Sequence, residues 1–251
     1  MSSARPSSVN LGPITTSNLF FSKYIIIYIL EIWLAAIPVT FWGYICYLDL
    51  VYFWWAWLLI PFFCLELYWM FIILTAWIAK ILLVIVCKMH PPREGVFNIN
   101  ETKDYFYWHL RSFIRSLPFT LIRYSAFPWL DFLIYNFLSG SKFNKCAMSS
   151  VMFDGWIDTE FIETGNNCMI GLGSIILSHY IERDLFILKK VKLHDGAIVG
   201  AKAVVMPGTV IGKNTTLGVC SNTVMDQKLD PNSVYIGLKC KKVKDYSKKS
   251  E

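Results

Sequence analysis

Hydrophobic positions first form two long apolar runs, at residues 24–47 and 51–87. The first run has 24 residues and one charge, and at about 1.5 Å per residue it is long enough to cross a bilayer as a helix. The second run has 37 residues, too many for one crossing. Pro61 lacks a backbone donor and redirects a helix, so we expect an interfacial or bent first part and a spanning part near residues 62–86.

Two carboxyl residues, Glu31 and Glu66, lie inside these runs. An ionisable group at membrane depth is either functional, or it faces a neighbouring helix, snorkels to the interface or is protonated. Neither has a basic partner in the apolar segments, and we favour the second interpretation.

Arginines alternate with aromatic residues in the segment that follows the apolar runs, at Arg111, Arg115 and Arg123. Two prolines interrupt this segment. Such mixtures are typical of short interfacial helices at the lipid headgroup level, and a soluble amphipathic helical collar fits the pattern equally well.

A period of six residues replaces the helical pattern from about Met152 onward. Its aliphatic positions are Leu193, Val199, Val205, Ile211 and Leu217, and the small residues four places later are Ala197, Ala203, Thr209 and Thr215. The same phase is visible earlier at Thr164, Ile170 and Ile176, with Cys168 and Ser174 as the small residues. Between Ile176 and Leu193 the step is 17, so an inserted segment of different geometry interrupts the repeat there.

A six-residue period indicates a solenoid of short strands and turns, with one inward aliphatic residue per face. Three faces per turn stack the coils about 4.8 Å apart, with parallel pairing between coils. A glycine follows the aliphatic residue in four units, where we expect a turn with positive φ: Gly171, Gly200, Gly212 and Gly218.

Residues 164–243 resemble the hexapeptide-repeat acyltransferases, whose fold is a left-handed parallel β-helix. The end of the stretch, LGVCSNTVMDQKLDPNSVYIGLKCKKVK, is similar to the closing coil of acetyl-CoA-dependent members. The matching residues are Ser221, Pro231, Asn232, Val234, Gly237, Lys242 and Val243. Leu238 and Lys239 depart from the usual Asn-Pro.

A second, looser resemblance covers residues 93–225 and the stretches REGVFNI, FPWLDFLIYNFLSG and VMFDGWIDTEFIETGNN. They are similar to the membrane-linked hexapeptide domains at the C-termini of some amino-acid polymer synthetases. Together the resemblances imply acetyl-CoA or another acyl-CoA as acyl donor, and a homotrimer with active sites between subunits.

The expected fold class is therefore a membrane α-helical N-terminal region followed by a left-handed parallel β-helix. The expected divisions are a disordered leader (1–18), about two transmembrane helices (19–90), membrane-proximal interfacial helices (91–148), the β-helix acyltransferase domain (149–237) and a basic tail (238–251).

Composition and charge agree with a membrane location. Hydrophobic residues make up 55% of the chain and charged residues 17%, whereas soluble domains average about a quarter charged. Most Lys and Arg of this +6 chain flank or follow the apolar runs, so we expect an integral membrane protein with both termini cytoplasmic, and no nucleic-acid module. The seven cysteines include no CxxC pair and are interpreted as unpaired thiols in a reducing compartment.

His179 is the candidate catalytic residue because it lies where the repeat is interrupted. Acyl transfer to a hydroxyl or amine needs a base, and neutral imidazole suits this role near neutral pH. The membrane-linked relatives also carry a His followed by an acidic residue at this place. Glu182 and Asp184 are expected to orient the imidazole from the inserted loop, and the alternative is an exposed, idle histidine. His194 occupies the position of a glycine in the repeat, and this position favours a structural role at a coil corner or a subunit contact.

The candidate cofactor-binding residues are Gly200, Ala201, Gly218 and Ser221, along which a pantetheine arm would lie, and Lys241 and Lys242, which would meet its phosphates. The alternative is that coil corners require small residues and that the lysines are solvated.

Three functions are compatible with this pattern. The leading one is a membrane-anchored O- or N-acyltransferase with an amphipathic or lipid-linked acceptor. The second is a non-catalytic trimeric membrane scaffold. A zinc carbonic anhydrase on the same solenoid is disfavoured, because it needs three His ligands and the repeat region contains only His179 and His194, so we expect no metal.

Overall fold

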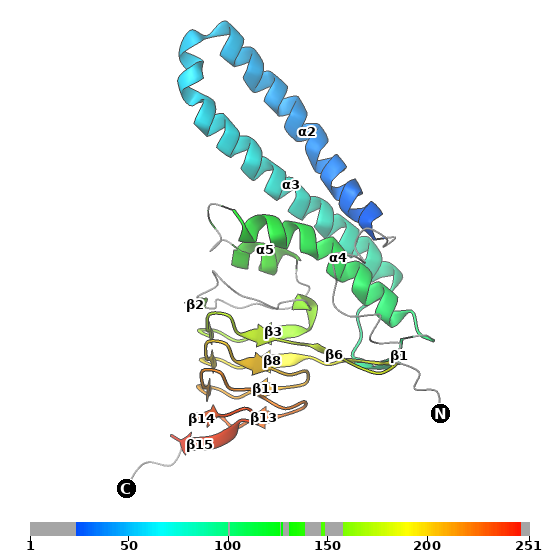
Figure 1. Ribbon diagram of the computed structural model, residues 1–251, viewed down its shortest axis with the longest axis vertical. Coiled ribbons are helices and arrows are strands. Elements are labelled where there is room, and N and C mark those ends of the chain that lie inside the picture. The colour runs from blue at the N-terminus through cyan, green and yellow to red at the C-terminus, as the bar shows by residue number, and fades with distance from the viewer. Residues whose placement is uncertain are drawn as a thin grey trace, which may run out of the picture.

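The computed structural model describes residues 24–99, 101–125, 127, 131–138, 147–148 and 158–246. Figure 1 shows three layers along the long axis: a pair of long helices, two shorter helices that cross beneath them, and a stack of β-coils. The expected leader (1–18) lies outside the described residues.

The long helices are α2 (Ile25–Tyr52) and α3 (Ile60–Met89), joined by the 3-10 helix η2 (Trp54–Leu59). Pro61 lies in the first turn of α3. A backbone N–H at this position has no acceptor within the helix, so its absence in proline costs no hydrogen bond. The second apolar run is therefore divided at Pro61, as expected. Both helices are long and apolar enough to cross a membrane by length and composition.

The two carboxyl residues of the helix pair occupy different environments. Glu66 Oε1 accepts a hydrogen bond from Trp42 Nε1 at 3.0 Å, which links α3 to α2. Glu31 is fully buried, and neither of its carboxyl oxygens has a hydrogen-bond partner within the described structure. Both residues thus face the interior of the helical layer or a neighbouring helix.

The crossing helices are α4 (Asp104–Arg123) and α5 (Asp131–Leu138). Pro118 lies inside α4 and does not end it, contrary to the expected interruption. Arg111 and Arg115 are 2% exposed. They are therefore not headgroup-level side chains, because α4 is covered by α3 on one side and by the β-region on the other (Figure 1).

Within the described residues, ten short strands between positions 162 and 236 build the coils. They are β3 (Ile162–Thr164), β4 (Met169–Ile170), β5 (Ile175–Ile176), β8 (Val191–Leu193), β9 (Ile198–Val199), β10 (Val204–Val205), β11 (Val210–Ile211), β12 (Thr216–Leu217), β13 (Lys228–Leu229) and β14 (Ser233–Ile236). Successive strands join three different sheets in rotation, and each pairs in parallel with the equivalent strand of the next coil. The isolated bridge Val204↔Asn222 continues the third face.

The repeat positions form the core of this three-sided stack. Val199, Val205, Ile211 and Leu217 have no exposed surface, and the small residues four places later are also fully buried. The six-residue period therefore predicted the inward positions correctly.

The explanation expected for the glycines was wrong. Gly171, Gly200, Gly212 and Gly218 do not adopt positive φ. A Cβ on Gly171 would lie 2.4 Å from the backbone nitrogen of Ala201, in the next coil. Close stacking of coil backbones, not turn geometry, requires glycine here.

The interruption of the repeat is a β-hairpin, β6 (His179–Glu182) and β7 (Leu185–Leu188). Ile170 pairs with Val199, 29 residues later, whereas Val199 pairs with Leu217, 18 residues later, so the first coil holds 11 extra residues. The strand β1 (Gly95–Asn98) pairs antiparallel with β7 and completes a three-stranded sheet. Residues 95–98, which lie in the range expected to form interfacial helices (91–148), thus form an edge of the hairpin sheet.

Two strands lie beyond the expected limits of the coil domain (149–237). The strand β2 (Ala147–Met148) already pairs with β4. The strand β15 (Lys241–Asp245) pairs antiparallel with β14 and closes the last coil, so part of the expected basic tail is ordered sheet. Antiparallel pairing stops the parallel stack from extending further.

Candidate active site

His179 is the first residue of β6, at the base of the hairpin, where its backbone is opposite Leu188. Its imidazole Nδ1 lies 2.5 Å from Asp158 Oδ2. The side chain of His179 is 16% exposed and that of Asp158 is 1% exposed. A carboxylate only accepts hydrogen bonds, so Nδ1 carries the proton and Nε2 is the basic nitrogen of the neutral ring.

Asp158 is held on its other side by α4. Trp108 donates a hydrogen bond from Nε1 to Asp158 Oδ1 at 2.5 Å. The carboxylate is therefore fixed by two donors, and its orientation sets that of the imidazole. Such support from a second layer of residues is how a side chain is held ready for catalysis.

Aromatic rings enclose the imidazole. The ring centroid of Trp108 lies 4.6 Å from that of His179, and the ring centroid of Phe186 lies 6.2 Å away. Burial among these groups lowers the pKa of His179, but the charge of Asp158 and its hydrogen bond raise that pKa more, and the net result is a pKa above the ordinary 6.5. The ring is thus a stronger base than a free imidazole.

A buried ion cluster holds the segment that carries Asp158. Arg111 Nε donates to Glu160 Oε1 at 3.0 Å, and Arg115 Nη1 donates to Glu160 Oε2 at 3.1 Å. The side chain of Glu160 is 5% exposed. Trp108, Arg111 and Arg115 share one face of α4 at i, i+3 and i+7, so three side chains of one helix hold residues 158–160. We call this set the α4 clamp.

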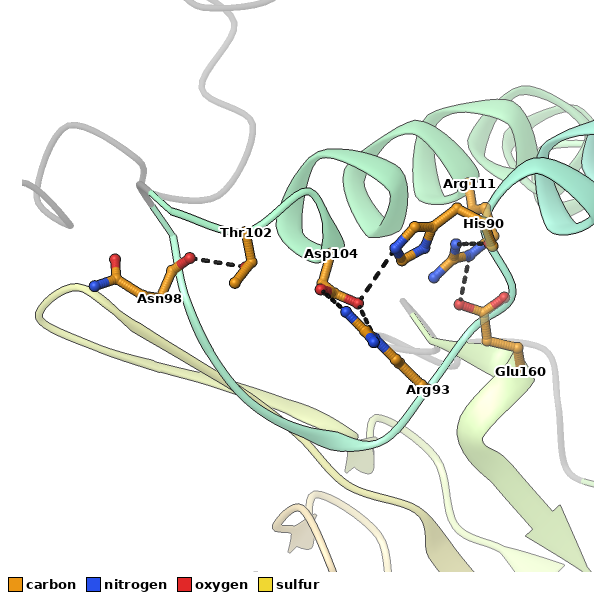
Figure 2. A network of polar contacts seen from close by, with 7 residues as sticks. All are labelled: His90, Arg93, Asn98, Thr102, Asp104, Arg111 and Glu160. Carbon is orange, nitrogen blue, oxygen red and sulfur yellow. Dashed lines mark hydrogen bonds and ion pairs between the residues drawn. The ribbon is translucent and has the colours of Figure 1, made fainter.

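Figure 2 shows how the same helix is tied to the chain that enters from α3. Arg111 Nη1 also donates to the backbone oxygen of His90 at 3.2 Å. Arg93 makes two hydrogen bonds of 2.7 Å to the Asp104 carboxylate, and these bonds hold the pKa of Asp104 below its usual range. The end of α3, the start of α4 and residues 158–160 are therefore joined in one polar network.

The acidic residues expected to orient His179 lie elsewhere. Glu182 is opposite Leu185 at the far end of the hairpin, and Asp184 lies in the turn between them, where its backbone oxygen accepts a hydrogen bond from Ile99. The carboxylate that contacts the imidazole is that of Asp158. The expectation for Glu182 and Asp184 assumed that neighbours in sequence are neighbours in space, but the strand carries them away from the ring.

The expected cofactor residues are spread over the coil corners and its closing strands. Gly200 and Gly218 are stacked so closely that a Cβ on Gly200 would lie 2.5 Å from the carbonyl carbon of Gly218, and Ala201 follows at the same corner. Ser221 is fully buried, and its hydroxyl bonds the backbone of Gly237 and Val219. The alternative interpretation of these positions, that coil corners require small residues, fits this packing.

The two lysines differ in their surroundings. Lys242 Nζ lies 2.8 Å from Asp245 and 2.9 Å from Asp230, and these contacts raise its pKa. Lys241 is an exposed residue of β15. His194 is exposed on the turn after β8, beside a shallow depression of about 200 Å³ that Glu163, Lys192 and Asp195 also line.

Sequence reasoning missed Asp158 and Trp108. The available signal was a polar stripe at Trp108, Arg111 and Arg115 on one face of an otherwise aromatic helix. Within the described ranges, no group of three or more His, Cys, Asp and Glu residues is arranged to hold a metal ion.

Comparison with solved structures gives several similar folds. A hexapeptide-repeat acetyltransferase of Vibrio cholerae is 13% identical, with 58% of this chain and 94% of that chain covered and a TM-score of 0.45. A maltose O-acetyltransferase of Clostridium difficile is 18% identical, with coverages of 61% and 92% and a TM-score of 0.44. A galactoside acetyltransferase in complex with coenzyme A is 13% identical, with coverages of 61% and 86% and a TM-score of 0.45.

No protein-family model matches the chain, and no curated protein sequence is significantly similar to it. At these identities and TM-scores the likenesses do not assign a chemistry. The side chains around His179 are the features of the structure that indicate a chemistry.

Proposed function

We propose that the protein is a membrane-anchored acyltransferase that moves an acetyl or other acyl group from acyl-CoA to a hydroxyl or amine. The observation that carries this proposal is the buried Asp158 carboxylate on His179 Nδ1, which leaves Nε2 as a base at the edge of the coil. The six-residue repeat resembles that of the hexapeptide-repeat acyltransferases, and this resemblance implies acyl-CoA as the acyl donor.

The chemistry follows from the dyad. His179 Nε2 removes the proton from the acceptor O–H or N–H as the acceptor oxygen or nitrogen attacks the thioester carbonyl. The C–S bond then breaks, and the thiolate of coenzyme A leaves with the electron pair and receives the proton from the imidazolium. Asp158 stabilises the imidazolium in between, and Trp108 keeps Asp158 in place. Direct transfer requires no covalent enzyme intermediate.

The helix pair supports the rest of the proposal. We assign α2 and α3 as two spans that place both chain ends in the cytoplasm, where acyl-CoA is available, and the catalytic coil against the bilayer. An amphipathic or lipid-linked acceptor fits this location. Three chains would form the active enzyme, as the resemblance implies.

The test is transfer of radiolabelled acetyl from acetyl-CoA by the purified full chain, with a panel of amphipathic hydroxyl and amine acceptors. Replacing His179 by Ala is expected to reduce turnover by about 10²–10⁴-fold, the contribution typical of a general base. Replacing the exposed His194 by Ala is the matched control and should leave turnover unchanged.

Acetyl-CoA binding separates this proposal from the scaffold alternative. Full turnover of His179→Ala would eliminate the proposed base. Failure of the wild-type protein to bind acetyl-CoA in a calorimetric titration would instead favour a non-catalytic scaffold.

A further inference from the structure

An apolar groove lies on the face of α3 that α4 and α5 cover. It has a volume of about 430 Å³, within the range of small-ligand sites. Its lining residues are Trp69, Ile72, Ile73, Ala76, Trp77, Ile122, Leu133, Ile134 and Phe137. All nine are hydrophobic, and the only side-chain hydrogen-bond donors among these nine residues are the indole N–H groups of Trp69 and Trp77.

The groove is open on the outer surface of α3. Ile73 and Leu133 are each 50% exposed, and Trp77 is 55% exposed, although all three line it. Ile73 and Trp77 belong to the exposed apolar side chains of the helix pair, and a bilayer is a suitable solvent for such side chains. The groove is therefore continuous with the lipid-facing surface, and this step rests on the membrane anchoring in the proposed function.

A cation marks one end of the groove. Lys80 lies one turn after Trp77 on α3, and its Nζ is 5.6 Å from the ring centroid of Phe137. Lys80 is the single basic residue between positions 24 and 87. It is placed to meet an anionic headgroup while a hydrocarbon chain lies along the stripe from Trp77 to Trp69. Eight residues of helix make that stripe about 12 Å long.

We propose that this groove binds an anionic phospholipid of the bilayer, with its chain against α3, α4 and α5 and its phosphate at Lys80. Charge complementarity favours an anionic over a zwitterionic lipid, and anionic lipids are concentrated in the cytoplasmic leaflet, where the coil end of α3 is assigned.

The apolar stripe of the groove is separate from the histidine dyad. Ile122 in the groove and Trp108 beside Asp158 are 14 residues apart on α4, which is about 21 Å along the helix. A hydrocarbon chain along the stripe therefore lies away from His179. The lipid instead fills the space between α3, α4 and α5 and so helps to fix the helix that carries the α4 clamp.

The experiment is native mass spectrometry of the purified full chain in detergent, titrated with phosphatidylglycerol or phosphatidylcholine. Wild-type protein is expected to bind phosphatidylglycerol about fivefold more tightly, the effect of one cation near an anionic headgroup. Lys80→Gln should remove this preference. Lys88→Gln changes an exposed lysine two turns further along α3, outside the groove, and should keep the preference.

A second pair of variants tests the chain site. Ala76→Trp fills the groove from its floor and Ile73→Trp fills it from its open side, and each should weaken binding of both lipids about tenfold. Circular dichroism and size exclusion identify which of the two remains folded. His179→Ala should bind both lipids as the wild type does, so loss of catalysis and loss of lipid binding are separate outcomes.

Three results would overturn the proposal. They are equal affinity of the wild type for the two lipids, equal effects of Lys80→Gln and Lys88→Gln, and undiminished lipid binding by a folded groove-filling variant. A polyprenyl phosphate that binds more tightly than phosphatidylglycerol, and is lost in Ala76→Trp, would assign the groove to a lipid-linked substrate instead.

Discussion

At the scale of single residues, the coil corners follow a rule that the hydrophobic pattern did not reveal. Positive φ recurs every sixth residue, three places after each inward position: Asn167, Gly173, Gly196, Lys202, Gly208, Asn214, Cys220, Asp226 and Asn232. Gly, Asn and Asp adopt this conformation at the lowest cost, and they occupy all of these corners except Lys202 and Cys220. The glycines directly after the inward residues serve a different purpose, which is close contact between coils.

This difference predicts unequal costs for two neighbouring glycines. Gly171→Ala places a Cβ 2.4 Å from the backbone of Ala201, which is unable to move without disturbing the next coil. Gly173→Ala has room, with Lys202 Cγ at 3.6 Å, and incurs only the left-handed penalty of about 1–2 kcal/mol. Thermal unfolding midpoints in detergent should therefore fall further for Gly171→Ala. The reverse order would show that φ, not stacking, requires these glycines.

The pH dependence of the reaction tests the dyad. His179 must be neutral to act as a base, and its folded pKa lies above 6.5, so wild-type kcat/KM should rise as the pH increases through that raised pKa. Asp158→Asn removes the charge that raises the pKa and replaces the charged acceptor of the Nδ1 hydrogen bond by a neutral amide, while burial, which lowers the pKa, remains. The rise of kcat/KM with pH should therefore occur at lower pH. The maximal rate should fall because the tautomer of the His179 ring is no longer fixed.

The matched control for this profile is Glu182→Gln, at the far end of the same strand. Its profile should overlay that of the wild type. If Glu182→Gln shifted the pH at which kcat/KM rises and Asp158→Asn did not, Glu182 and not Asp158 would be the carboxylate that orients His179. The raised pKa also affects stability. The charged pair of His179 and Asp158 contributes fully to the free energy of unfolding below pH 6.5, and this contribution is lost as the pH rises through the pKa of His179 in the folded protein.

At the scale of elements, α4 joins the helical layer to the coil. Its Ile114 packs with Ala79, Leu83 and Val86 of α3, and its Trp108 packs with Phe161, Phe186 and Leu188 of the β-region. The α4 clamp adds charged hydrogen bonds between these two apolar clusters. Nε and Nη2 of Arg115 are buried without a partner within the described structure, so the clamp already carries an incompletely paired cation.

Loss of the Glu160 carboxylate, which pairs with Arg111 and Arg115, should therefore lower the free energy of unfolding. Glu160→Gln leaves two buried guanidinium groups without a counter-charge, and breaking a buried pair in this way typically costs about 3–5 kcal/mol. Glu163→Gln is the control, because Glu163 is 40% exposed and its ion pairs with Lys190 and Lys192 are at the surface. Exposed pairs of this kind contribute at most about 1 kcal/mol.

Thermal unfolding followed by near-ultraviolet circular dichroism measures both variants, since Trp108 reports on the junction. Equal midpoints for Glu160→Gln and Glu163→Gln would show that the clamp is not a structural link. A stable Glu160→Gln protein with reduced turnover would show that the clamp acts on the position of Asp158 alone.

At the scale of the whole molecule, the coil carries an apolar surface that other copies of the chain are suited to cover. Leu172 and Val219 follow the stacked glycines Gly171 and Gly218 and are 48% and 65% exposed, and Leu238 is 75% exposed. Large exposed apolar side chains at one corner of the coils, with the smaller Ala201 between Leu172 and Val219, are typical of an association surface.

Self-association is therefore expected through this corner. The purified protein should have about three times the 29.0 kDa mass of the chain in detergent-corrected light scattering. Combined Val219→Asp and Leu238→Asp substitutions should reduce the mass to that of one chain by placing like charges in the contact. Lys213→Asp changes a surface residue elsewhere and should leave the mass unchanged. A single-chain mass for the wild type would contradict the proposed trimer.

The sequence by itself determined the repeating core and the two apolar helices. Side-chain burial in a three-sided coil depends on the phase of six consecutive positions, and a helix long enough for a bilayer depends on composition over about 20 residues, so both are local properties that a sequence displays directly. The place of His179 was visible for the same reason, because an interruption of a period is itself part of the pattern.

Only the tertiary structure decided what surrounds that histidine. Asp158 is 21 positions before His179 and Trp108 is 50 positions before Asp158, and no periodic pattern connects them. They meet because the hairpin β6–β7 leaves the coil beneath α4, where β1 pairs with it and the α4 clamp fixes the incoming strand. Contacts of this kind depend on where three separate elements cross, and the free energy that fixes the crossing comes from burial and charge pairing across the whole junction.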